Sequence, residues 1–452
     1  MHAQRRWVLA LTAIASLMVA LDTLLVSTAL TTIRLDLGAS LEALEWTVNA
    51  YNLSLAVLLM PAAALGDRFG RRRMFAAGLG LFVAASAACA LSTDAGTLIA
   101  ARTVQGAGAA LVISLALAIV SAAYPPERRG GAIGILEGIT GLAVIAGPVL
   151  GGAIAAGIAW EWIFWLNVPI GLAVLPLALA RIDESVGEDT ALDLAGVALI
   201  TAGGFGIVWG LVRGNGAGWA SLEVLGALAG GALLVLAFVA WELRAREPML
   251  PMGLFASRAF SGGNAATFAL FASIFVGVFF IAQFLQTGLG FDPLEAGLGL
   301  LPWTALLFVV APIAGLLADR VGERPLLVGG LAVQAAGFGW LALIVAPGIA
   351  YSELVAPLLV TALGGSLAIP PAASAVLRSI PDGAIGKAAG ANGMLRELGG
   401  VFGIALGVAV FAGAGSYASA AAFSDGFAAA IVAAATLSLA GALAASAVPG
   451  RA

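Results

Sequence analysis

Five ionisable residues lie inside long apolar stretches of the sequence. They are Asp22, Arg102, Glu137, Arg396 and Glu397. A charged residue at the centre of a bilayer costs about 2.5–3.5 kcal/mol on insertion scales, so each of them is a functional candidate. Burial favours the neutral form of a carboxyl group and a nearby cation favours the charged form, so a buried acid can exchange protons as its surroundings change. We predict proton-coupling roles for Asp22, Arg102, Glu137 and Glu397.

The composition places these residues in a membrane. Of the 452 residues, 61% are hydrophobic and 10% are charged, against about 25% charged residues in soluble domains. The mean hydropathy is +1.05. The apolar runs are continuous rather than alternating, which predicts an all-α, polytopic membrane protein. The first run continues to about Thr28 and contains Asp22, so we interpret it as a membrane span and not as a signal peptide.

The reactive residue types are too few for catalysis. The one histidine, His2, lies at the N-terminus, and the one cysteine, Cys89, lies in an apolar run. Neither a histidine-based site nor an internal disulfide is therefore expected. No loop combines a nucleophile with a base, and the sequence has no Walker loop for ATP. We expect no enzyme activity, no cofactor, no metal and no nucleic-acid partner.

Fourteen apolar segments have a length suited to crossing a bilayer, which takes about 20 helical residues. They lie at about 7–28, 46–65, 74–92, 97–122, 131–157, 162–180, 193–212, 221–241, 260–284, 293–317, 325–346, 352–377, 386–413 and 422–447. If both termini are cytoplasmic, 17 of the 21 basic residues fall on the cytoplasmic side. We predict this orientation, in the plasma (inner) membrane of a bacterium.

The chain repeats a loop at an offset of 252 residues. The loop after the second span reads LGDRFGRRR (65–73), and the loop after the tenth span reads LADRVGERP (317–325). Repeats of this kind are typical of transporters. We predict two related bundles of six helices with two further helices between them, which gives domains at 1–182, 183–258 and 259–452.

This arrangement resembles the major facilitator superfamily, and the fourteen spans resemble its fourteen-helix drug:proton antiporter family. Stretches that match the family's pattern are LDTLLVSTAL in span 1, WTVNAYNLSLA in span 2, RTVQGAGAA in span 4, GPVLGG in span 5, WEWIFWLNVPIG in span 6 and RELGG in span 13. The resemblance covers essentially the whole chain. It departs at Ser27 and Thr31, where the family usually has Asn and Pro, so substrate contacts are not carried over to these two positions.

The resemblance implies roles for two motifs and one pair of residues. In the family, the loop after span 2 and its repeat form a cytoplasmic latch, which corresponds here to Gly66, Asp67, Arg68, Gly70, Arg71, Arg72, Asp319 and Arg320. The stretch GPVLGG resembles the motif that marks antiporters, with Gly147, Pro148, Gly151 and Gly152. Spans 1 and 4 are neighbours in the family's fold, so we expect Asp22 and Arg102 to lie at similar depth and to pair.

Structural alternatives remain open for the polar residues. The Asp22–Arg102 pair can be a purely structural salt bridge, and Glu137 can be an interfacial carboxylate. Adjacent helical residues point about 100° apart, so Arg396 and Glu397 are not expected to face one cavity centre together. As candidate substrate-binding residues we select Asn49, Asn52, Gln283 and Arg396. Hydrogen bonding between helices explains the three amide side chains equally well.

The residues and the resemblance together predict a monomeric, proton-coupled exporter of small amphipathic drugs or toxic organic compounds. It would work by alternating access in the lipid bilayer, with protons as the second substrate. The alternative is a proton-coupled or facilitated importer of a small metabolite. The motif GPVLGG and the absence of His and Lys from the spans argue against import.

Overall fold

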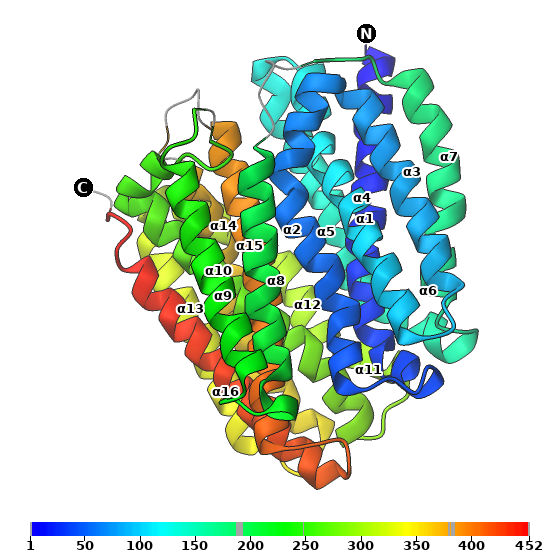
Figure 1. The fold of residues 1–452 in the computed structure, drawn as a ribbon, viewed down its shortest axis with the longest axis vertical. Coiled ribbons are helices and arrows are strands. Elements are labelled where there is room, and N and C mark those ends of the chain that lie inside the picture. Colours follow the sequence, from blue (N-terminus) through cyan, green and yellow to red (C-terminus); the bar gives the residue numbers. More distant parts are fainter. Residues whose placement is uncertain (1, 187–192, 247, 378–379, 381–384, 451–452) are drawn as a thin grey trace. The chain divides into compact units, whose positions relative to one another are not determined.

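The computed structural model describes residues 2–186, 193–246, 248–377, 380 and 385–450. These residues form helices and connecting loops, and none of them lies in a strand. The chain divides into two compact units, Met1–Val197 and Ala198–Ala452 (Figure 1). The finer division into three domains stays a prediction.

The described residues of the first unit form seven helices. They are α1 (His2–Asp36), α2 (Leu41–Phe69), α3 (Arg71–Ala90), α4 (Ala95–Ala123), α5 (Pro126–Gly157), α6 (Trp162–Trp165) and α7 (Asn167–Arg181). Helix α4 packs against α1, α2 and α3, and α1 also packs against α5 and α7. Side chains from α4 therefore reach three neighbouring helices, and this places the candidate site described below.

The second unit begins just after the start of α8 and carries the remaining α-helices. They are α8 (Leu194–Ala217), α9 (Leu222–Glu242), α10 (Arg258–Gln283), α11 (Pro293–Gly299), α12 (Leu301–Val321), α13 (Glu323–Ile344), α14 (Tyr351–Leu377), α15 (Ile385–Ala414) and α16 (Ala420–Ala445). Helix α10 continues as a π-helical turn, Phe284–Gly288, and packs against α14, α15 and α16. Helix α13 packs against α14 and α16.

Two like helix junctions lie 252 residues apart. Helix α2 ends and α3 begins around Gly70, whose φ is +102°, and α12 ends and α13 begins around Gly322, whose φ is +87°. Only glycine adopts such angles at little cost, so both turns require it. The offset found in the sequence thus recurs at two backbone turns, while the complete pseudo-repeat stays a prediction.

The helices have the length and the surface of membrane spans. Thirteen helices in the described part of the chain are long and apolar enough to cross a bilayer, and α5 adds a shorter apolar segment, Ala146–Gly157. Large apolar side chains on their surfaces are exposed, including Leu222 (89%), Leu316 (70%) and Leu343 (87%). Exposed apolar side chains of this size on long apolar helices suit contact with lipid. The protein is therefore a multi-pass membrane protein, and the count of fourteen spans stays a prediction.

Candidate functional site

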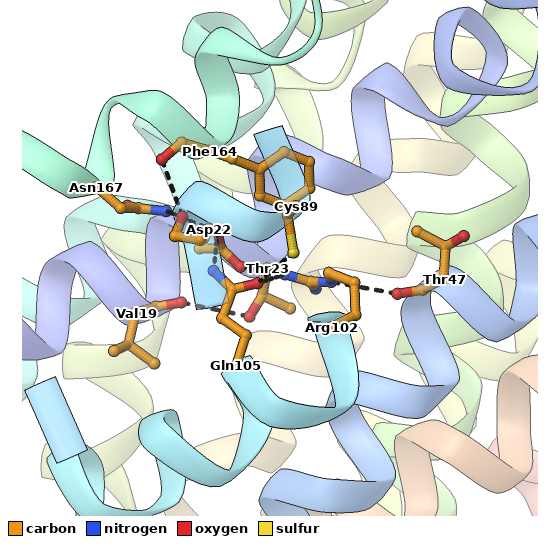
Figure 2. A network of polar contacts seen from close by, with 10 residues as sticks. Val19, Asp22, Thr23, Thr47, Cys89, Arg102, Gln105, Phe164 and Asn167 are labelled. Carbon is orange, nitrogen blue, oxygen red and sulfur yellow. Dashed lines mark hydrogen bonds and ion pairs between the residues drawn. The ribbon is translucent and has the colours of Figure 1, made fainter. Parts of the chain in front are cut away.

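A buried ion pair joins α1 and α4 of the first unit (Figure 2). The guanidinium of Arg102 on α4 pairs with the carboxylate of Asp22 on α1, and their side chains are 1% and 0% exposed. The sequence predicted this pair. Its location deep among helices means that neither charge is compensated by bulk water, so the pair depends on the groups around it.

Two side-chain amides complete the surroundings of Asp22. Its Oδ1 accepts a hydrogen bond from Nε2 of Gln105 at 2.9 Å and another from Nδ2 of Asn167 on α7 at 2.8 Å. Together with Arg102, three donors surround one carboxylate, an arrangement that suits its ionised form. Protonation of Asp22 would remove the charge that Arg102 pairs with, so the two protonation states favour different contacts across α1, α4 and α7.

Arg102 also has contacts that do not depend on Asp22. Its Nη1 donates to Oε1 of Gln105 at 2.7 Å, and its Nε donates to the carbonyl oxygen of Thr47 on α2 at 3.2 Å. The Cζ atom lies 4.0 Å from the ring centroid of Tyr51, a cation–π contact. The arginine is thus fixed by α2 and α4 and can remain in place when its acid partner changes.

Asn167 was not selected from the sequence as a site residue. Its Nδ2 donates to Oγ of Ser86 on α3 at 3.0 Å as well as to Asp22, and the Ser86 hydroxyl donates to the carbonyl oxygen of Phe164 at 2.9 Å. The stretch WEWIFWLNVPIG contains Asn167, but nothing in that stretch indicates a partner on α1. The one feature of the sequence that could have indicated a role for Asn167 is that it is a polar residue inside an apolar segment.

Glycines let the helices approach closely enough to form this network. A Cβ atom at Gly106 would lie 2.4 Å from the carbonyl oxygen of Tyr51, and one at Gly108 would lie 2.6 Å from the backbone nitrogen of Phe82. Small residues serve this purpose at membrane helix interfaces. Helix α4 therefore carries both the charged residue and the small residues that bring α2 and α3 close to it.

The GPVLGG motif packs against the helix that carries Asp22. A Cβ atom at Gly147 would lie 2.5 Å from Cβ of Leu24, and one at Gly151 would lie 2.8 Å from the carbonyl oxygen of Leu25. Pro148 and Gly152 are buried in the same helix. The motif thus determines how closely α5 approaches α1, within one turn of the acid.

The predicted latch loop is held to the end of α7. Asp67 and Arg71 form an ion pair at 2.7 Å, and the backbone nitrogen of Arg72 donates to Oε1 of Glu184 at 2.9 Å. Arg72 Nη1 also lies 3.3 Å from the carbonyl oxygen of Ile182. Helix α3 has no side-chain cap from its own N-cap residue, so Glu184 supplies the acceptor that its first turn needs.

The surroundings of three other predicted latch residues, Gly66, Arg68 and Arg320, are as follows. A Cβ atom at Gly66 would lie 2.1 Å from Cδ2 of Leu115, so α2 approaches α4 closely there. The Cζ atom of Arg68 lies 5.4 Å from the ring centroid of Phe69. Arg320 is exposed in the last turn of α12.

Removal of the Glu184 side chain is expected to destabilise the protein modestly. Glu184→Ala leaves the amide of Arg72 without its acceptor, and loss of a helix cap costs about 1 kcal/mol. Partly exposed ion pairs add little, so Glu184→Gln, which keeps an acceptor oxygen, should lose clearly less. Thermal unfolding of the purified variants in detergent measures both effects. Equal losses for the two variants would mean that the charge, and not the cap, is what stabilises α3.

Two of the predicted site residues have side chains outside those that the structure describes. These are Glu137, whose backbone belongs to α5, and Asp319, whose backbone belongs to α12. Their assignments to proton coupling and to the latch therefore stay predictions.

Arg396 and Glu397, the two candidate charged residues on α15, form an ion pair. Nη2 of Arg396 lies 2.9 Å from Oε1 of Glu397, and its Cζ lies 5.6 Å from the ring centroid of Phe271. Their long side chains bridge the 100° between adjacent helical positions, and the expectation that the two do not face one cavity centre together stays a prediction. The arginine side chain is 41% exposed and the glutamate 11%, so the arginine presents the more accessible face.

Among the predicted substrate-binding amides, Gln283 already has hydrogen-bond partners within the second unit. It is fully buried, it accepts a hydrogen bond from the hydroxyl of Tyr417, and its Nε2 donates to the carbonyl oxygen of Phe279 at 2.8 Å. Asn49 and Asn52 are fully buried on α2. Asn49 donates to Glu45, an acid that the sequence reasoning missed because it placed the start of this span at residue 46 rather than at Leu41.

Within the described residues, no three His, Cys, Asp or Glu side chains come together in a way that would hold a metal ion. The site instead consists of one acid, one arginine and hydrogen-bonding amides. In this set Asp22 is the one group that could carry a proton, and its contacts join α1, α4 and α7.

Comparison with known proteins gives consistent matches along the chain. Residues 12–404 match the family described as Major Facilitator Superfamily. The chain is 35% identical over 397 residues to the tetracenomycin C resistance and export protein of Streptomyces glaucescens, covering 87% of this chain and 73% of that protein. It is 32% identical over 397 residues to the multidrug resistance protein Stp of Mycobacterium tuberculosis (strain CDC 1551 / Oshkosh), covering 87% and 74%. It is 34% identical over 404 residues to the cephamycin export protein CmcT of Amycolatopsis lactamdurans, covering 88% and 83%.

Solved structures of transporters share the fold. A POT family transporter in complex with 5-aminolevulinic acid superposes with a TM-score of 0.72 at 14% sequence identity, covering 96% of this chain and 94% of that chain. A D-xylose–proton symporter superposes with a TM-score of 0.69 at 16% identity, covering 97% and 96%. At these identities the likeness extends to the fold alone.

Proposed function

Because this chain belongs to the major facilitator superfamily and is a membrane transporter rather than an enzyme, we propose that it exports small amphipathic drugs or toxic organic compounds in exchange for protons. The buried pair of Asp22 and Arg102 carries this proposal. An acid that is isolated from water and contacted by one arginine and two amides suits a proton-binding site that changes helix contacts when it is occupied.

The proposed cycle couples the charge of Asp22 to the packing of three helices. When Asp22 is ionised, it holds α4 and α7 to α1 through Arg102, Gln105 and Asn167. Proton uptake weakens this connection and favours the alternative arrangement. Glu137 and Glu397 are the further acids that we assign to proton coupling, and alternating access follows because cargo and proton favour different arrangements.

Export is favoured over import by two observations. The glycines of the GPVLGG motif, which resembles that of antiporters, pack against α1 next to Asp22. Similar proteins are named as resistance and export proteins for tetracenomycin C and cephamycin. Import of a small metabolite is therefore not favoured.

The remaining assignments complete this proposal. We place the protein in the bacterial plasma membrane as a monomer with both termini in the cytoplasm. The latch loops would then lie on the cytoplasmic side, where Asp67, Arg71 and Arg72 of the first unit and Asp319 and Arg320 of the second would control opening. Asn49, Asn52, Gln283 and Arg396 remain candidates for contact with cargo.

A vesicle assay tests the function directly. Inside-out membrane vesicles with an acidic lumen are mixed with a pH-sensitive dye and then with lipophilic cations, neutral antibiotics and zwitterionic antibiotics in turn. We expect at least one class of compound to discharge the gradient only when the protein is present. If none does so while the purified protein still binds compounds, proton-coupled export is wrong and uniport or import becomes the better account.

A further inference from the structure

A stripe of polar side chains runs along one face of α2. Glu45, Asn49 and Asn52 follow one another at intervals of four and three residues, which places them on the same side of a helix. All three are fully buried, at 0% exposure. A carboxylate and two amides in such a position are unusual in an apolar helix, because every buried polar group needs a partner.

The stripe is separate from the Asp22–Arg102 network. Helix α2 contacts α4 through Thr47, whose carbonyl oxygen accepts from Arg102, and through Tyr51, whose carbonyl oxygen lies against Gly106. At about 100° per residue, Glu45 and Asn49 lie on the opposite side of α2 from these contacts. The stripe therefore has no part in holding the ion pair.

Most polar atoms of the stripe have no hydrogen-bond partner in the described part of the chain. Nδ2 of Asn49 donates to Oε1 of Glu45 at 3.1 Å. The second carboxylate oxygen of Glu45, the amide oxygen of Asn49 and both amide atoms of Asn52 make no hydrogen bond. A buried polar group left in this state destabilises the folded protein, so a purely structural role explains the stripe poorly.

The chemistry of these atoms indicates what would satisfy them. They comprise acceptor oxygens of Glu45, Asn49 and Asn52, one of them part of a carboxylate, and a single donor, so the stripe suits a cation that donates N–H bonds. Glu45 and Asn52 are seven residues apart, about 10 Å along the helix axis. A single inorganic cation is coordinated at about 2.3–2.6 Å and cannot reach both ends. An extended organic amine can.

We propose that Glu45, Asn49 and Asn52 bind the protonated amine of amphipathic cargo, with Glu45 supplying the charge and the two asparagines orienting the bound molecule. This inference rests on the proposed export function and names its substrate class. It is independent of the proton site, because the stripe and the Asp22 network occupy different faces of α2.

Binding of a matched pair of compounds tests this inference. The full chain is purified into lipid nanodiscs and titrated with doxorubicin, which carries a protonated amine, and with N-trifluoroacetyl-doxorubicin, which keeps the ring system without the charge. Fluorescence anisotropy of the compounds gives both Kd values. We expect Glu45→Gln to raise the Kd for doxorubicin about tenfold or more, through loss of a charge-assisted hydrogen bond, and to leave the Kd for the neutral compound unchanged.

Two further variants test whether the effect on binding is specific to the charge of Glu45. Asn52→Leu should weaken binding of doxorubicin without removing the preference for the charged compound. Glu353→Gln changes an exposed glutamate in the first turn of α14 and should affect neither Kd. A Glu45→Gln variant that binds doxorubicin as the parent does, or that weakens both compounds equally, overturns the inference, as does a parent that binds no doxorubicin. Failure of the export function shows separately, as absence of proton release in vesicles for every compound while charge-selective binding at Glu45 persists.

Discussion

Replacement of Asp22 by asparagine is expected to reduce substrate-driven proton release from inside-out vesicles to background. Asparagine has nearly the same shape as aspartate, and its one amide oxygen can accept the hydrogen bonds from Gln105 and Asn167, but its NH2 group then faces Arg102 and it cannot bind and release a proton. Transport of cargo without a pH gradient should persist, measured as exchange of labelled for unlabelled substrate across proteoliposomes. Loss of proton release with retention of exchange is the result that identifies a coupling residue.

The variant is also expected to be less stable than the parent. Removal of one member of a buried ion pair commonly costs about 3–5 kcal/mol, because the other charge remains buried. Arg102 keeps its contacts with Gln105, Thr47 and the ring of Tyr51, so the loss should lie at the lower end of this range. Thermal unfolding in detergent and the amount of protein in the membrane measure it.

Asp94→Asn is the matched control for this substitution. Asp94 caps the start of α4, where its carboxylate accepts from the backbone nitrogen of Thr97 at 2.9 Å, and this bond lowers the pKa of Asp94. Asparagine caps helices about as well as aspartate, so proton release should be unchanged. Undiminished proton release in Asp22→Asn would instead assign coupling to another acid, with Glu397 as the next residue to test.

The sequence predicts the helical fold well because few backbone structures can span a membrane. The apolar runs follow the need to satisfy every backbone hydrogen bond inside lipid, and the glycine turns of the two related loops fall at Gly70 and Gly322. The ion pair of Asp22 and Arg102 was predictable because the family resemblance implies that spans 1 and 4 are neighbours, and two opposite charges in neighbouring apolar spans have few other partners.

Contacts between residues distant in sequence were harder to predict from the sequence. Glu184 lies in a loop, and nothing local indicates that it caps α3, which begins 113 residues earlier. Asn167 contacts Asp22 only because α7 packs against α1. Glu45 was missed because hydropathy places the start of a span where the apolar residues begin, whereas α2 begins in the polar residues before them. The first residue of α2 is determined by its N-cap, Ser40, and not by hydropathy.

Addition of one methyl group at Gly151 is expected to impair both stability and transport. In Gly151→Ala the new Cβ would lie 2.2 Å from Oγ1 of Thr28 and 2.8 Å from the carbonyl oxygen of Leu25, so α5 must move away from α1. Insertion of extra volume into a packed interface costs about 1–3 kcal/mol. Helix α5 packs against α1 close to Asp22, so its displacement should also lower proton release per molecule of folded protein. Thermal unfolding and the vesicle assay measure the two effects on the same preparation.

Gly138→Ala in the same helix provides the control, because no atom lies within 4 Å of a Cβ at that position. Alanine favours a helix over glycine by about 1 kcal/mol, so this variant should be as stable as the parent or more stable. The double variant Thr28→Ala/Gly151→Ala removes the closest contact but leaves the one with the Leu25 carbonyl, and it should recover part of the loss. If Gly151→Ala unfolds and transports like Gly138→Ala, close packing of α5 on α1 is not what the motif provides. A loss confined to Gly151→Ala and partly reversed at Thr28 would mean that the glycines of GPVLGG act by setting the distance between the motif helix and the proton-binding helix.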